Sequence, residues 1–97
     1  MLAIDYGADG SVIISGRLDA AQSPRAQAFL DAVQGEVSLD CGALEYISSA
    51  GLGVLLKTQK RLMQSAGSLR LKRVNPHLRD VLRYAGFDQI FVIEPAE

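Results

Sequence analysis

The feature that most constrains the fold is an alternation, along the whole chain, of short apolar runs with stretches whose apolar residues recur every three or four positions. The first two apolar runs, residues 2–6 and 12–15, are separated by residues 7–11, which read Gly-Ala-Asp-Gly-Ser. The Asp-Gly pair supplies the positive backbone angles that a hairpin turn needs. The chain is therefore predicted to begin with an antiparallel hairpin.

Three amphipathic helices are predicted after this hairpin, because apolar residues recur at the spacing of one helix face. The predicted helices run from Ser23, as the N-cap, to a point near Gly35; from Ser48 or Ser49 to Gly67; and from Asn75, as the N-cap before Pro76, to Gly86. Their apolar positions are, in chain order, Ala26, Phe29, Leu30 and Val33; Leu52, Leu55, Leu56, Leu62, Met63 and Ala66; and Leu78, Val81, Leu82 and Ala85.

Further strands are predicted between and after these helices. Residues 37–40 form a strand candidate, and residues 42–47 carry the chain toward the second helix. Leu69 and Leu71 alternate with charged residues as in a half-exposed strand, and residues 90–93 form a last short strand. Strands that alternate with helices are joined by right-handed crossovers and run parallel, so we expect an α/β domain with a mixed sheet, an N-terminal hairpin and three helices.

The composition supports a single folded domain over residues 1–97. The chain is 48% hydrophobic and 22% charged, which suffices for a core. A chain of this length buries only about 60 to 65 per cent of its unfolded surface, so two separate cores are not expected. The net charge of −1 argues against a general nucleic-acid-binding protein.

The charges are unevenly distributed along the chain. Residues 1–56 carry most of the acids, and residues 57–83 carry most of the bases. The acids of the first part are Asp5, Asp9, Asp19, Asp31, Glu36, Asp40 and Glu45, and the bases of the second are Lys57, Lys60, Arg61, Arg70, Lys72, Arg73, Arg79 and Arg83. This segregation could make one face basic, although ordinary solvated helix and strand faces are the simpler interpretation.

The sequence favours a cytoplasmic protein without a membrane span. Its longest apolar-plus-Gly run, residues 50–56, is far shorter than the roughly 20 residues that a spanning helix needs. The first ten residues lack the basic start and apolar stretch of a secretory signal. The single cysteine, Cys41, cannot form an internal disulfide and is expected to close a strand as a small buried residue.

The stock of reactive side chains does not favour an enzyme, a metal site or a cofactor. There is one His, one Cys and no pair at a metal-ligand spacing. His77 is expected to be an exposed polar residue near a helix cap. Residues 51–53, Gly-Leu-Gly, lack the third glycine and the Gly-Lys-Ser/Thr ending of the nucleotide-binding fingerprints.

Residues 44–53 are the segment that stands out, because two serines and two glycines lie at the start of the longest predicted helix. Ser48 or Ser49 is expected to cap that helix by accepting a hydrogen bond from a free backbone amide. A serine there can also be a switch, since a phosphate adds about −1.5 to −2 charge at pH 7. A dianion is stabilised at a helix N-terminus, so such a switch would act on a partner's surface and leave the fold intact.

Two motifs resemble those of the STAS domain family. Residues 16–19, Gly-Arg-Leu-Asp, are similar to its G-x-[LI]-D element, and residues 46–53, Tyr-Ile-Ser-Ser-Ala-Gly-Leu-Gly, are similar to its more specific [FY]-[MI]-[DS]-S-[SAT]-G-L-G signature. Asn75-Pro76 and the helix that ends at residues 85–87, Ala-Gly-Phe, extend the likeness over nearly the whole chain.

The resemblance implies a bacterial anti-sigma factor antagonist, also called an anti-anti-sigma factor, that takes part in partner switching in transcription regulation. Unphosphorylated members of this type bind an anti-sigma factor that is also a serine kinase. Phosphorylation of the signature serine breaks the complex, and a metal-dependent serine phosphatase restores it. Other STAS domains do not switch and are adaptor subunits of transport complexes such as lipid-transport ATPases, which is the alternative function.

Carried over by position, the phosphorylated serine is Ser49. Ser48 stands where many switch proteins have Asp and is the alternative target. The partner-binding residues that the resemblance implies are Asp19, Ser48, Ala50, Gly51, Leu52, Gly53, Val54 and Lys57.

Overall fold

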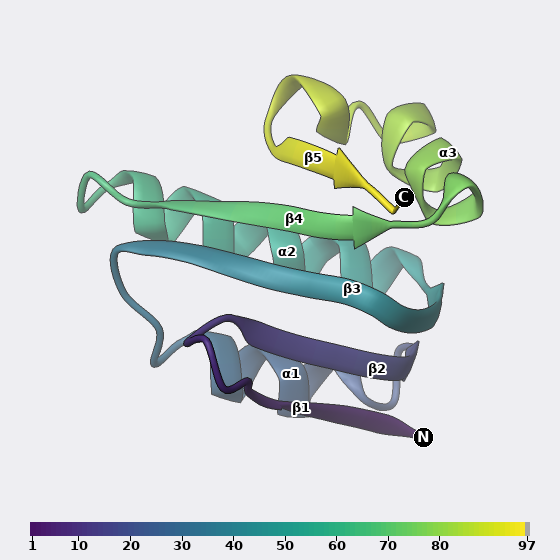
Figure 1. Cartoon of the computed structure of the whole chain (residues 1–97), viewed down its shortest axis with the longest axis horizontal. Helices are drawn as coiled ribbons and strands as arrows, with labels where there is room; N and C mark the ends of the chain where they lie inside the picture. Colours follow the sequence, from purple (N-terminus) through teal and green to yellow (C-terminus); the bar gives the residue numbers. More distant parts are fainter. Residues whose placement is uncertain (97) are drawn as a thin grey trace.

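In the computed structural model, which describes residues 1–96, five strands form one sheet in the order of the chain (Figure 1). The elements are β1 (Leu2–Tyr6), β2 (Val12–Leu18), α1 (Ser23–Leu30), β3 (Glu36–Ile47), α2 (Ser49–Met63), β4 (Ser68–Val74), α3 (Pro76–Tyr84), a 3-10 turn (Phe87–Gln89) and β5 (Val92–Pro95). β1 pairs with β2 antiparallel, and all other neighbouring strands are parallel. The predicted α/β domain, with its mixed sheet, N-terminal hairpin and three helices, is confirmed.

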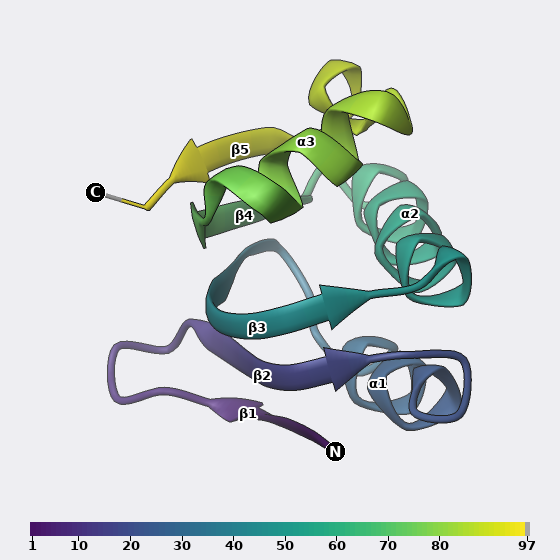
Figure 2. The same ribbon diagram turned by 90° about the vertical axis from the view of Figure 1, so that its right-hand side faces the viewer.

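The helices cover the sheet unequally. α1 and α2 lie on one face, α3 lies at the end of the sheet beside β4 and β5, and no helix of residues 1–96 covers the opposite face (Figure 2). The core therefore lies between the sheet and the pair α1 and α2. Its largest fully buried apolar side chains are Val12, Ile14, Leu18, Leu30, Leu39, Leu55, Leu62, Leu69, Leu71 and Val74. None of the described helices is long and apolar enough to cross a membrane.

The hairpin forms as its turn residues predict. Gly10 has a φ of 86°, and the backbone N–H of Ser11 donates to the Asp9 carboxylate at 3.0 Å. β2 runs on to Leu18, beyond the predicted end at residue 15. This extension includes a bulge at Gly16, where φ is 85° and a Cβ atom would overlap the carbonyl oxygen of Met1, so only glycine fits.

The predicted cap and end of the first helix are both wrong. Gln22 is the N-cap of α1, and the hydroxyl of Ser23 instead donates to the backbone oxygen of Asp19 at 2.7 Å. α1 ends at Leu30 and not near Gly35. The guanidinium of Arg61, on α2, donates to the carbonyl oxygens of Leu30 at 2.8 Å and Val33 at 2.6 Å. This tertiary contact supplies hydrogen bonds to carbonyl groups at and beyond the end of α1, where the helix itself offers no donor.

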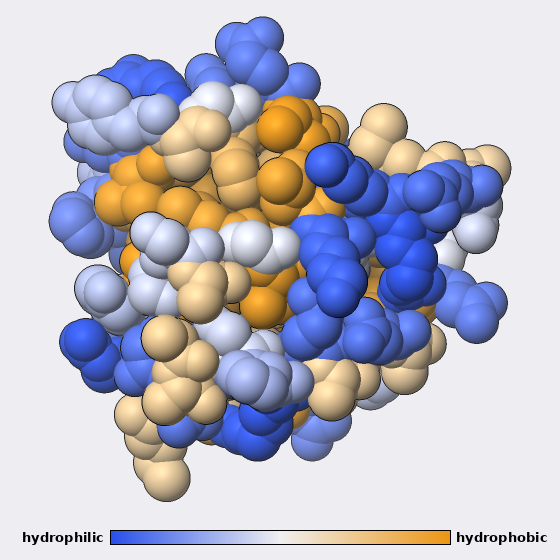
Figure 3. All heavy atoms as spheres, turned by 180° about the vertical axis from the view of Figure 1, so that it is seen from behind, coloured by the Kyte–Doolittle hydropathy of each residue, from blue (hydrophilic) through white to orange (hydrophobic). Residues whose placement is uncertain are grey.

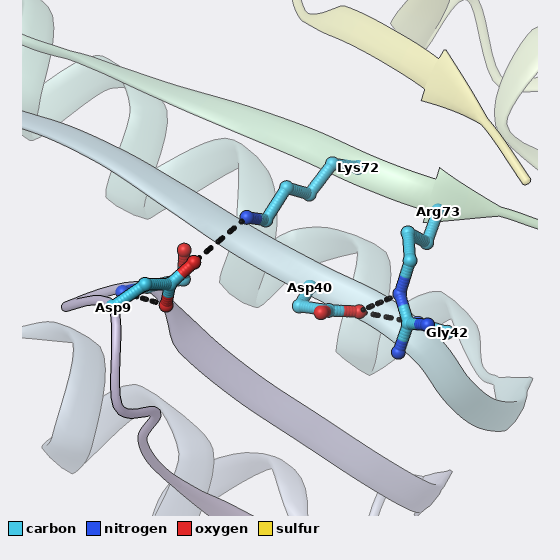
Figure 4. A network of polar contacts seen from close by, with 6 residues as sticks. Asp9, Asp40, Gly42, Lys72 and Arg73 are labelled. Carbon is cyan, nitrogen blue, oxygen red and sulfur yellow. Dashed lines mark hydrogen bonds and ion pairs between the residues drawn. The ribbon is translucent and has the colours of Figure 1, made fainter.

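β3 is one long strand where two separate segments were predicted. Cys41 therefore lies inside the strand and does not close it, although it is buried as expected. Burial, with a smaller effect of Asp40, raises the pKa of the Cys41 thiol to about 12. The carboxylate of Asp40 accepts hydrogen bonds from the Gly42 N–H and from the Arg73 guanidinium, both at 2.9 Å, which ties this part of β3 to β4 (Figure 4).

The buried face of α2 differs from the predicted leucine stripe. Met63 and Ala66 are exposed, whereas Thr58 and Gln59 are buried. The Thr58 hydroxyl donates to the backbone oxygen of Val54 at 2.8 Å. The Gln59 amide accepts from the Leu69 N–H at 2.6 Å and donates to the carbonyl oxygen of residue 90 at 3.0 Å. Because these polar groups are hydrogen-bonded, they can occupy core positions that apolar periodicity does not predict.

The last third of the chain follows its local signals closely. Asn75 caps α3 by accepting from the Leu78 N–H at 2.8 Å, and Gly86 follows the helix with a φ of 80°. Both features were predicted. The last strand begins at Val92, two positions later than expected, because residues 87–89 form the 3-10 turn.

Candidate docking site at the start of α2

The start of α2 lies against the end of β2. The Ser48 N–H donates to the carbonyl oxygen of Leu18 at 2.9 Å, which holds the β3–α2 junction beside the β2–α1 loop. In that loop the Asp19 carboxylate accepts a hydrogen bond from the Gln22 N–H at 3.0 Å, and the backbone oxygen of Asp19 accepts one from the Ser23 N–H. The two motifs noted in the sequence, residues 16–19 and 46–53, are therefore adjacent in space.

Ser48 is the residue that caps α2. Its hydroxyl oxygen accepts from the Gly51 N–H at 3.2 Å, and its carbonyl oxygen accepts from the Leu52 N–H at 2.9 Å. Its φ of −92° and ψ of 174° are the extended values usual for an N-cap. Of the two serines that the sequence left open for this role, the structure assigns the cap to Ser48.

Ser49 is the first residue of α2 and is exposed. Its hydroxyl makes no hydrogen bond within residues 1–96, and the first turn of the helix contains no acidic residue. The hydroxyl thus projects at the positive end of the helix dipole with its oxygen unengaged.

The two glycines of the signature have different surroundings. A Cβ atom at Gly51 would lie 2.7 Å from the carbonyl oxygen of Leu18 and 2.8 Å from a side-chain carbon of Ile47. A Cβ atom at Gly53 would meet no atom within 4 Å. Gly51 therefore permits the close contact between α2 and the end of β2, whereas Gly53 leaves a bare, exposed stretch of helix backbone.

The predicted partner-binding residues divide into an exposed and a buried group. Ser49, Ala50, Gly53 and Lys57 are exposed, and Asp19, Ser48 and Leu52 are half-buried. Val54 is only 6% exposed and Gly51 is buried, so these two of the expected partner-binding residues lie beneath the exposed ones. Val54 faces the sheet because it lies one turn from the buried Thr58 on the same side of α2.

The side of the molecule that carries α1 and α2 has an apolar area bordered by hydrophilic side chains (Figure 3). Leu52 and Leu56 of α2 pack against the core but stay partly exposed. Lys60 continues the exposed face one turn beyond Lys57. The signature motif does not include Leu56 and Lys60, although helical spacing from Leu52 and Lys57 would have found both.

A comparison with protein-family profiles decides the family. The profile described as "Mlab, STAS domain" matches residues 5–94. The chain belongs to the STAS domain family. The resemblance of residues 16–19 and 46–53 is thereby confirmed as a family relationship.

One curated relative and several solved structures are similar to this STAS domain. It is 40% identical over 91 residues to BtrV of Bordetella bronchiseptica, a candidate anti-sigma factor antagonist, and the match covers 88% of this chain and 78% of BtrV. An anti-sigma factor antagonist from Mycobacterium paratuberculosis has a TM-score of 0.80 at 23% identity, over 98% of this chain and 86% of that one. The Bacillus cell fate determinant SpoIIAA in its phosphorylated form has a TM-score of 0.69 at 21% identity, over 96% of this chain and 90% of that one. The structural likenesses show a shared fold.

The single His and the single Cys of this STAS domain lie on elements other than α2. His77 is exposed on α3, and the Cys41 thiol is buried in the sheet. Within residues 1–96, no three or more His, Cys, Asp or Glu side chains are grouped as a metal site would require. The described features at the start of α2, an exposed hydroxyl, bare backbone and partly exposed leucines, are those of a surface for docking.

Proposed function

We propose that this STAS domain is an anti-sigma factor antagonist. It binds an anti-sigma factor that is also a serine kinase while Ser49 is unphosphorylated, and it is released when Ser49 is phosphorylated. The observation that carries this proposal is the division of roles between two adjacent serines. Ser48 supplies the helix cap, so the exposed Ser49 hydroxyl has no hydrogen bond to lose among residues 1–96 and would be accessible to a kinase. The similarity to BtrV, a candidate anti-sigma factor antagonist that is 40% identical over 88% of this chain, supports the same role.

The effect of the phosphate follows from where Ser49 lies. A dianion at the first residue of α2 meets the positive end of the helix dipole, so the fold of the domain is retained. The partner, however, must desolvate the phosphate or be repelled by it. Release therefore results from a change at the surface, and removal of the phosphate by a metal-dependent serine phosphatase restores binding.

The docking surface consists of the exposed residues at the start and along the outer side of α2. Ser49, Ala50, Gly53 and Lys57 would contact the partner, with Leu52 at their edge. Asp19 and Ser48 border this surface and also hold the loop and the helix start. Gly51 and Val54 support it from within by packing α2 against β2 and the sheet.

The first test is phosphorylation of the purified domain. Each serine-kinase anti-sigma factor of the source organism is incubated with the domain and ATP, and the product is mapped by mass spectrometry. We expect one phosphate, on Ser49, and none on the Ser49→Ala variant. Phosphate on Ser48 alone would contradict the assignment of Ser49.

The second test separates switching from constitutive binding. Ser49→Ala should bind the anti-sigma factor as the wild type does, and Ser49→Asp should bind poorly, with both variants fully folded. If no kinase phosphorylates either serine and Ser49→Asp binds its partner like the wild type, the alternative function is favoured. In that case the domain is a non-switching adaptor of a transport complex.

A further inference from the structure

The basic side chains of β4 are neutralised within the chain. Lys72 and Arg73 lie on the sheet face away from α1 and α2 (Figure 4), and Arg70 is on the same side of β4 as Lys72. The ion pairs, with their N···O distances, are Arg70–Glu94 at 3.2 Å, Lys72–Asp9 at 3.5 Å and Arg73–Asp40 at 2.9 Å. The three cations of β4 are thus paired with carboxylates of the same molecule.

The basic side chains of α2 are arranged differently. The helix contains Lys57, Lys60 and Arg61 and no Asp or Glu. Arg61 is engaged by the carbonyl oxygens at the end of α1. Lys57 and Lys60 are exposed, and neither makes an ion pair or a hydrogen bond with any of residues 1–96. Two positive charges on α2 therefore remain without a partner among residues 1–96.

Helix stability accounts for only one of these two lysines. Lys60 lies in the last turn of α2, where a cation is favourable to the helix dipole. Lys57 lies in the middle of the helix, where that effect has faded. The charge at Lys57 thus has no role in the fold that the described contacts show.

Both lysines share a side of α2 with Ser49. Ser49, Gly53, Lys57 and Lys60 recur at intervals of four, four and three positions, which places them along one face, here called the α2 strip. All four are exposed, and the partly exposed Leu52 and Leu56 flank them. The α2 strip is therefore a basic surface beside apolar side chains, with Ser49 at one end.

We propose that the α2 strip is recognised by an acidic surface of the anti-sigma factor, and that Lys57 and Lys60 speed the association. This inference rests on the proposed function and names the chemistry of its partner. A phosphate on Ser49 adds about −1.5 to −2 charge to the strip, which offsets the two lysines. Phosphorylation thereby removes the charge complementarity along the whole strip, in addition to its effect at Ser49 itself.

The test compares two double variants that remove the same amount of charge from different faces. Lys57→Gln with Lys60→Gln neutralises the strip, and Arg70→Gln with Lys72→Gln neutralises ion-paired residues of β4. Association and dissociation rates are measured with the purified anti-sigma factor kinase that binds the wild type, at about 0.01 M and about 0.15 M salt. The Debye length falls from about 30 Å to about 8 Å between these concentrations.

We expect the strip variant to associate about tenfold more slowly at low salt, with a smaller difference at high salt and little change in dissociation. The β4 variant should associate like the wild type, and circular dichroism should show both to be folded. Equal slowing in both variants, or no slowing in the strip variant, would overturn this inference while the proposed function stands. If the wild type binds no serine-kinase anti-sigma factor, the proposed function fails and this inference fails with it.

Discussion

Ser48 and Ser49 are adjacent and chemically identical, yet their hydroxyls have different surroundings. The Ser48 hydroxyl accepts from the Gly51 N–H, and the Ser49 hydroxyl is exposed at the first position of α2. A structural and a regulatory function that the sequence placed on either serine can therefore be separated by mutation. The capping residue can be altered without touching Ser49, the proposed target of modification, and the reverse also holds.

Alanine substitutions should reveal this division in stability. Ser48→Ala removes the cap and should lower the free energy of unfolding by about 0.5 to 2 kcal/mol. Ser49→Ala removes a hydroxyl without a described hydrogen bond and should change it by less than about 0.5 kcal/mol. Urea denaturation of both variants measures the difference. A larger loss for Ser49→Ala than for Ser48→Ala would show that the cap has been assigned to the wrong serine.

The two glycines of α2 are also expected to respond differently to substitution. Gly51→Ala places a methyl group against the backbone of Leu18, and overpacking of this kind costs about 1 to 3 kcal/mol. Gly53→Ala adds a methyl group in open space and should stabilise the helix by about 0.5 to 1 kcal/mol.

If the partner approaches the bare backbone at Gly53, the Gly53→Ala substitution should weaken binding even though it stabilises the helix. Gly53→Ala is expected to raise the midpoint of thermal unfolding and to weaken binding to the anti-sigma factor. Calorimetry measures the first effect, and a titration with the purified partner measures the second. Unchanged affinity of Gly53→Ala would place the interface elsewhere on α2.

At the scale of the elements, the sequence predicts best where the signal is local. The Asp-Gly turn of the hairpin and the Asn75-Pro76 start of α3 depend on residues within a few positions of one another, and both form as predicted. The end of α1 depends on Arg61, which is distant in the sequence. The buried face of α2 depends on Gln59, whose hydrogen bonds to β4 and to residue 90 are tertiary contacts.

The same distinction applies to the candidate site. The motif at residues 46–53 locates it, because a helix start with serines and glycines is a local pattern. The leucine stripe that periodicity predicts for α2 is turned toward the exposed Met63. It therefore left out Val54, which is buried on the other side of the core-facing surface. The choice between Ser48 and Ser49 as the cap required the backbone path, in particular the hydrogen bond from the Ser48 N–H to Leu18.

The contact between β3 and β4 at Asp40 should make stability depend on pH. Partial burial by itself raises the pKa of Asp40. The hydrogen bonds from the Gly42 N–H and Arg73 lower the pKa by more than burial raises it, so the net shift is downward. A lowered pKa in the folded state means that the carboxylate stabilises the fold above about pH 4 and that this stabilisation is lost as the pH falls below that value.

The Asp40→Asn variant isolates this contribution. Its free energy of unfolding should be lower than that of the wild type at pH 7, and the gap should narrow as the pH falls to 3, because the carboxylate of the unfolded chain takes up a proton before the folded one does. Urea denaturation at the two pH values measures the gap. A gap that stays constant would show that the charge of Asp40 contributes nothing to the β3–β4 contact.

At the scale of the whole molecule, there is surface for more than one partner, but partners that act on Ser49 must share one part of it. The described residues expose 5454 Å² in total, and a standard interface takes about 800 Å² from each partner. A kinase and a phosphatase that both act on Ser49 must approach the same end of α2. They would therefore compete for the domain, and the phosphate would select between them.

The kinetics of release should show where Ser49 lies within the interface. Charges at the rim of an interface act mainly on association, and groups at its buried centre act mainly on dissociation. Gly53 leaves open space beside the first turn of α2, so we place Ser49 at the centre and the lysines of the α2 strip toward the rim. A desolvation penalty of about 4 kcal/mol would then weaken binding about a thousandfold, mostly through faster dissociation.

Rates for phosphorylated and unphosphorylated protein at two salt concentrations decide between these placements. At high salt the lysines and the phosphate are screened in solution, so association should be similar for the two forms. Dissociation of the phosphorylated form should stay fast, because a phosphate in a dry interface is screened little by salt. If dissociation is unchanged and only association at low salt is slowed, Ser49 lies at the rim, and repulsion before contact accounts for the release of the partner.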